Sequence, residues 1–186
     1  MLHSPGHWTA RLWGAGMSPM ETTQGQTPAG HEALGRYLND HLLGATGGLE
    51  LFRRVTRSHR GTAKAAELEK LTGEIEQDRT SLLEITRALG VPVRSYEVWL
   101  GWTAEKVGRL KPNGGLLRRV PLSSVVELEA MTLGVAGKAA GWRVLRAVAD
   151  RDGRLDAGQL DILLERAARQ QETLEGLRMA AAAEVF

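Results

Sequence analysis

Four long segments of this chain place apolar residues alternately four and three positions apart, the spacing that aligns them on one face of an α-helix. The segments cover about residues 29–59 and 63–89, a third begins at Ser124, and a fourth begins near Asp156. An apolar face on a helix must be buried against other elements, and four such faces can bury one another. The pattern therefore predicts an all-α four-helix bundle.

One polar residue interrupts each apolar stripe near its middle: His41, Asp78, Lys138 and Gln170. In the fourth helix a small rotation would bring Gln171 to the same position. Polar residues at one level of a bundle either specify its register or belong to a site. We expect an ion pair between Asp78 and Lys138, with His41 and Gln170 or Gln171 nearby.

This polar core layer has three interpretations. A buried ion pair would fix the helix register, and removal of one partner would strand the other charge. Lys138 could instead extend to solvent. The layer could also line a small ligand or metal site, for which His41 and Asp78 supply few ligands. We favour the structural ion pair and assign no metal ligand, no catalytic residue and no cofactor.

The connections between the four segments differ in length. Those after residue 59 and after Ala149 are short turns, so each joins an antiparallel pair of helices. The connection 91–123 is over 30 residues long and includes an amphipathic stretch that begins at Ser95, which predicts a short extra helix. Such a link can cross the whole bundle, so the second and third helices can run parallel.

The same connectivity resembles that of the ferritin-like superfamily. The segments 37–42 and 127–130 are also similar to those of a bacterial four-helix-bundle family within it. Di-iron members of the superfamily place Glu on two helices and Glu-x-x-His on the other two. This chain has no Glu-x-x-His, and its nearest match is Glu76-x-x-Arg79, in which arginine cannot ligate a metal. The resemblance thus implies a ferritin-like bundle without the di-iron ligands.

Glycines concentrate in the first and third helices, at Gly44, Gly47, Gly48, Gly134, Gly137 and Gly141. Each glycine inside a helix costs about 1 kcal/mol relative to alanine. We therefore expect these glycines to face each other where two backbones approach closely. A helix bend or a dimer contact is the alternative.

Local signals predict where three helices begin. Thr62 is the expected N-cap of the second helix. Ser124 and Glu127 have capping-box spacing at the start of the third, and Asp156 with Gln159 has the same spacing at the start of the fourth.

Residues 1–27 are rich in Gly, Pro, Ser and Thr, so we expect a flexible N-terminal tail before a bundle domain of residues 28–186. A start at Met20 would leave residues 1–19 out of the native protein. The net charge of +2 indicates no nucleic-acid partner. The absence of cysteine, of a long apolar run and of a signal-peptide pattern favours a cytoplasmic location.

The expected extra helix presents Trp99 and Trp102, with basic residues near its end. We interpret these tryptophans as an interaction surface that packs on the bundle or at a dimer contact, although such a helix can also bind a membrane surface. The sequence as a whole favours a non-catalytic binding or interaction protein that forms a homodimer. The alternatives are a metal-dependent oxidoreductase or metal-storage bundle with an atypical site, and membrane-surface binding.

Overall fold

The computed structural model describes residues 28–94 and 121–186, and within those ranges the chain forms four α-helices and no strand. The helices are α1 (Pro28–Ser58), α2 (Ala65–Ala88), α4 (Pro121–Ala149) and α5 (Ala157–Ala183). The predicted all-α four-helix bundle is confirmed. The predicted tail, the predicted extra helix and its residues Trp99 and Trp102 lie outside the described residues.

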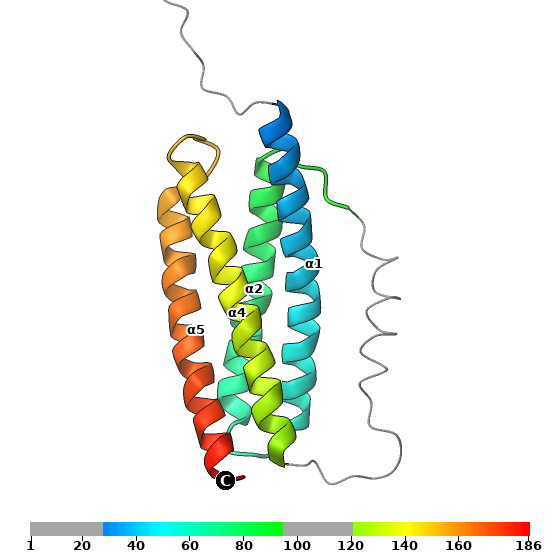
Figure 1. The fold of residues 1–186 in the computed structure, drawn as a ribbon, viewed down its shortest axis with the longest axis vertical. Coiled ribbons are helices and arrows are strands. Elements are labelled where there is room, and N and C mark those ends of the chain that lie inside the picture. The colour runs from blue at the N-terminus through cyan, green and yellow to red at the C-terminus, as the bar shows by residue number, and fades with distance from the viewer. Residues whose placement is uncertain (1–27, 95–120) are drawn as a thin grey trace, which may run out of the picture.

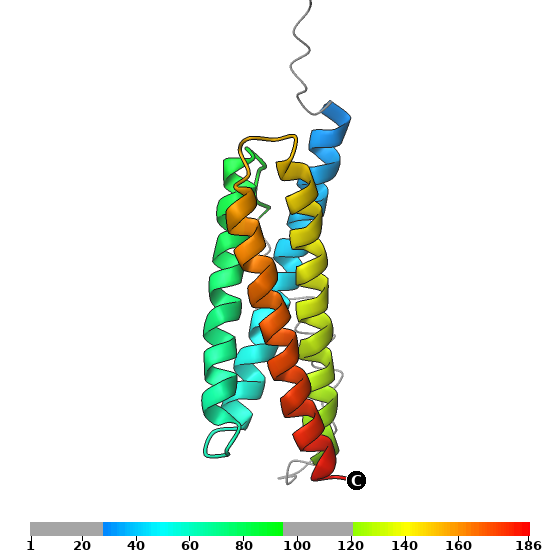
Figure 2. The same cartoon turned by 90° about the vertical axis from the view of Figure 1, so that its left-hand side faces the viewer.

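The four helices form two antiparallel hairpins that lie side by side (Figure 1). Following the chain, α1 and α5 run in one direction, and α2 and α4 run in the other. Helix α1 packs against α2 and α4, and α4 packs against α5. The parallel helices α2 and α4 are diagonally opposite, as the view in Figure 2 also shows. None of the described helices has the length and apolar character needed to span a membrane.

The buried apolar residues fall into two clusters, one toward each end of the bundle. One cluster extends from Leu49 to Val55 on α1 and includes Leu68 on α2, Met131 on α4 and Leu174 on α5. The second cluster includes residues of the other half of each helix, among them Leu38, Leu82, Trp142, and Leu160. On α2, Asp78 lies between the two clusters, since Ile75 belongs to the first and Leu82 to the second.

One of the three predicted helix starts is confirmed. Asp156 caps α5, and its carboxylate accepts a hydrogen bond of 3.1 Å from the Gln159 amide. The prediction for Thr62 is wrong, because α2 begins after Lys64 and the Thr62 hydroxyl donates to the His59 carbonyl instead. The prediction for Ser124 is also wrong, because α4 already begins at Pro121, whose fixed φ suits a first helical turn.

The two hairpins are bonded to each other at both ends of α2. At the C-terminal end, Gly90 has φ of +70°, and the Leu89 carbonyl accepts a hydrogen bond of 3.0 Å from Arg154 in the α4–α5 turn. At the N-terminal end, the Lys64 ammonium pairs with Glu184, which follows α5. The ends of α2 are therefore tied to the α4–α5 hairpin by these two side-chain contacts.

Candidate ligand-binding site

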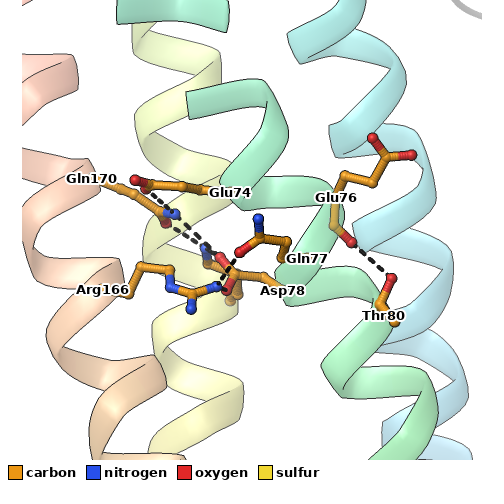
Figure 3. Close-up of polar contacts among 8 residues, drawn as sticks. Glu74, Glu76, Gln77, Asp78, Thr80, Arg166 and Gln170 are labelled. Carbon is orange, nitrogen blue, oxygen red and sulfur yellow. Dashed lines mark hydrogen bonds and ion pairs between the residues drawn. The ribbon is translucent and has the colours of Figure 1, made fainter. Parts of the chain in front are cut away.

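The polar core layer is centred on Asp78, which is only 1% exposed (Figure 3). Lys138 donates from its ammonium to Asp78 Oδ2 and to Gln170 Oε1. Arg166 Nη1 donates to Asp78 Oδ1 over 3.0 Å, and Gln170 Nε2 donates to Asp78 Oδ2 over 3.2 Å. The Asp78 carboxylate thus accepts three donors, from α4 and α5. The structure brings together three of the four predicted layer residues.

Two further residues complete the layer. Glu74 accepts a hydrogen bond of 3.0 Å from Gln170 Nε2, so Gln170 connects both carboxylates to Lys138. Arg166 also donates to Gln77 over 3.3 Å. Sequence reasoning missed Glu74 and Arg166, although each lies four residues before a predicted layer residue on the same helix. Positions i and i+4 share one helix face, and this rule would have found both.

Lys138 is buried rather than extended to solvent, since its side chain is 15% exposed and its ammonium lies on Asp78. Burial lowers the pKa of Lys138 because a charged ammonium loses hydration in the core, and Arg166 lowers it further. The carboxylates of Asp78 and Glu74 oppose this effect. The alternative of a solvent-directed Lys138 is therefore wrong.

His41 lies outside this network, on the face of α1 toward α4. Its ring packs against Tyr37, with ring centroids 4.4 Å apart, and against the backbone of Gly141. Burial lowers the pKa of His41, and the neighbouring Asp40 carboxylate partly opposes that shift. The apolar stripe placed His41 on the partly buried side of α1. His41 lies about one helical turn from the level of Asp78, so its side chain contacts other groups.

That environment is a pocket of about 550 Å³ between α1, α2 and α4. Leu38, Phe52, Ile75, Leu82, Val135, Trp142 and Leu145 provide most of its apolar lining. Asp78 and Lys138 form part of its inner surface, whereas Asp40, His41 and Arg79 are the other polar side chains that line it. The polar layer thus borders a cavity on its α1 side.

Glycines create the room for this pocket. Gly44, Gly48, Gly134, Gly137 and Gly141 all line it. A Cβ atom added at the first four of these positions would meet no atom within 4 Å. The same holds for Gly47, so the predicted close approach of the two backbones is wrong at these positions. The exception is Gly141, where a Cβ atom would lie 3.0 Å from the His41 ring.

Two hydrogen-bond donors in the lining lack a full set of partners. Trp142 is 1% exposed, and its buried indole Nε1 has no hydrogen-bond partner. Arg79 donates from Nε to the Thr46 hydroxyl over 3.1 Å, and no carboxylate within the described parts of the chain pairs with it. Trp142 Nε1 has almost no accessible surface, so the free N–H groups of Arg79 are the donors that a molecule in the pocket can reach.

Metal ligands are not grouped in the same way. Within residues 28–94 and 121–186, no group of three or more His, Asp or Glu side chains is placed to hold a metal ion. Comparisons of the chain with protein-family models, with curated proteins and with solved structures find no match. The candidate site therefore has to be interpreted from its own geometry.

Proposed function

We propose that this protein is a non-catalytic binding protein whose ligand is a small, largely apolar molecule held between α1, α2 and α4. The observation that supports the proposal is the pocket of about 550 Å³ lined mainly by apolar side chains and glycines. Pockets for small molecules are typically concave, apolar and roughly 300–1,000 Å³ in volume, with a few polar groups that orient the ligand. This pocket has each of those properties.

In the proposal, the polar core layer holds the bundle in register beside the pocket. The topology of two hairpins with parallel α2 and α4 supports a ferritin-like arrangement. The cations of Lys138 and Arg166 lie on the Asp78 carboxylate, at mid-bundle, where the di-iron proteins of that superfamily place metal ligands. We therefore assign the layer a structural role and do not extend the proposal to an oxidoreductase or to metal storage.

We also propose that the protein forms a homodimer in the cytoplasm, as the sequence suggests. The dimer is supported by an exposed apolar row on α4, formed by Leu122, Val126 and Leu133, of which Leu133 is 73% exposed. Exposed apolar residues that share one helix face are typical of a contact between proteins. Sedimentation at several protein concentrations, with Leu133→Lys as the variant, tests this contact.

Binding can be tested with the neutral fluorescent probe N-phenyl-1-naphthylamine. The filled variant replaces Gly134 and Gly137 by leucine, which puts side chains into the pocket at positions where a Cβ atom meets no neighbour. The control variant makes the same changes at Gly73 and Gly176, which also have free space but lie outside the pocket lining.

We expect the wild-type protein and the control variant to bind the probe equally, and the filled variant to bind it at least about ten-fold more weakly. Helicity and melting temperature should be kept in both variants, because leucine is a better helix former than glycine. Equal binding by the filled variant and the wild type, or no binding by the wild type, would overturn the proposed function.

A further inference from the structure

Two groups of the pocket lining, the Trp142 indole and the Arg79 guanidinium, can only donate hydrogen bonds, whereas His41 and Tyr37 can also accept them. The indole N–H of Trp142 is buried without a partner, and its Nε1 has almost no accessible surface, so a molecule in the pocket does not reach it.

Arg79 supplies a second donor group and a positive charge. The Thr46 hydroxyl holds its Nε at 3.1 Å, and this hydroxyl itself donates to the Leu42 carbonyl over 2.9 Å. The guanidinium of Arg79, a residue of α2, is therefore held against α1 by this hydrogen bond. Arg53 and Arg166, by contrast, pair with Glu76 and Asp78, respectively. No carboxylate of the described residues pairs with Arg79, so its remaining N–H groups can bind the carboxylate of a ligand.

The acidic residues of the lining do not offer the same opportunity to a cation. Asp78 already accepts hydrogen bonds from Lys138, Arg166 and Gln170. Asp40 lies exposed at the rim, where solvent weakens its attraction for a bound cation. The charges within the pocket are thus complementary to an anion. A carboxylate is an acceptor-only group that matches the fork of a guanidinium.

The shape of the pocket indicates the form of the apolar part of the ligand. Its lining on α1 extends from Tyr37 to Phe52, which corresponds to about 22 Å along the helix axis. Apolar side chains predominate on either side of the level of Arg79, and glycines form its α1 and α4 sides. An elongated apolar body fits this space better than a compact polar one.

On these grounds we propose that the ligand is an amphipathic carboxylate, with its carboxylate on Arg79 and its apolar body along the α1–α4 side of the pocket. This inference rests on the proposed binding function and specifies the chemical class of the ligand. Lys138 is not required as a ligand contact, because Asp78 and Gln170 already occupy its ammonium.

The test compares decanoate with decanol by isothermal titration calorimetry on the full chain. The two probes share their apolar chain and differ in the head group. We expect the wild-type protein to bind decanoate about ten-fold or more tighter than decanol, because hydrogen bonds to charged groups are the stronger ones. Arg79→Met keeps the apolar part of the side chain and should remove that preference, because it weakens the binding of decanoate more than that of decanol.

Arg87→Met on the same helix is the control, since Arg87 is exposed and outside the pocket lining, and it should keep the preference. If decanol and decanoate bind wild type equally, or if Arg79→Met keeps the preference, the carboxylate assignment is wrong and the binding function stands. If neither probe binds, the binding function fails as well.

Discussion

The two hairpins of this bundle meet along two seams that are built in opposite ways. At the α2–α5 seam, long polar side chains fill the space, and Asp78, Arg166 and Gln170 bond the helices at mid-length. At the α1–α4 seam, glycines of both helices leave a pocket, and the contact of His41 with Gly141 is the tight point. One seam fixes the hairpins relative to each other, and the other provides space for a ligand.

This difference shows how one helical core can fix the register of its helices and still contain a pocket. Hydrogen-bonded polar groups at one level permit one register only, because any shift would leave buried charges unpaired. With the register set at α2 and α5, the α1–α4 side can omit side chains without loss of the fold. The following substitutions test the two seams separately, and they are given in order of decreasing expected effect.

Removal of the central carboxylate should do the most damage. In Asp78→Leu, Lys138 and Arg166 lose their anion in a buried place, so we expect the free energy of unfolding to fall by about 3–5 kcal/mol and the melting temperature by roughly 10 °C. Thermal unfolding followed by circular dichroism measures it. Asp161→Leu, which breaks the exposed pair with Arg146, is the control and should cost under about 1 kcal/mol. Equal losses would contradict a structural role for the layer.

Removal of the ammonium should cost less, because Arg166 and Gln170 still bond Asp78. We expect Lys138→Met to lower the free energy of unfolding by about 1–3 kcal/mol in urea titrations. The double variant with Asp78→Leu should be more stable than the sum of the single losses predicts, because an apolar pair replaces the ion pair. Strict additivity would show that Asp78 and Lys138 do not interact in solution.

At the α1–α4 seam, alanine substitutions should have opposite signs at neighbouring glycines. Gly137→Ala should stabilise the protein by about 0.5–1 kcal/mol, since a Cβ atom there meets nothing and alanine favours the helix. Gly141→Ala should destabilise it, because its Cβ atom would press on the His41 ring. Gly73→Ala provides the reference gain. Destabilisation at both pocket positions would mean that α1 and α4 are in closer contact than described.

The smallest expected effect is a loss of stability at low pH. Burial lowers the pKa of His41 below its ordinary value of 6.5, so the unfolded chain binds the proton first as the pH falls. The stability that neutral His41 preserves is therefore complete above pH 6.5 and is lost as the pH falls through 6.5 toward the lowered pKa. Melting temperatures from about pH 8 to about pH 5 should fall more in wild type than in His41→Gln. Parallel curves would contradict the described burial.

Much of the bundle could be predicted from apolar spacing alone. With the exception of Thr86, the buried residues of α2 and α5 recur three or four positions apart and include Asp78 and Gln170, because these helices face a filled core on that side. The sequence left Gln170 and Gln171 as alternatives, and the structure decides for Gln170, which is buried, whereas Gln171 is partly exposed. The stripe of α1 is less regular, since His41, Ala45 and Gly48 border the pocket and are only partly buried.

The pocket itself could not be predicted, because glycine in a helix is compatible with two opposite arrangements. A missing side chain permits a close backbone contact, and it equally leaves a void when the backbones stay apart. The separation of α1 and α4 decides between these arrangements, and it depends on how all four helices pack together. Local spacing rules do not describe that distance.

The bonds along α2 and α5 also determine how the two hairpins can move. Arg154 holds the Leu89 carbonyl at one end, Asp78 is held by α5 at the middle, and Lys64 holds Glu184 at the other end. Two bodies fastened along one edge separate by rotation about that edge, as in hinge closure around ligands. A rotation about the line of these three contacts would carry α1 away from α4 and would leave Asp78, Arg166 and Gln170 close to the axis. A molecule can then reach the pocket without disrupting the bonds that hold the fold in register.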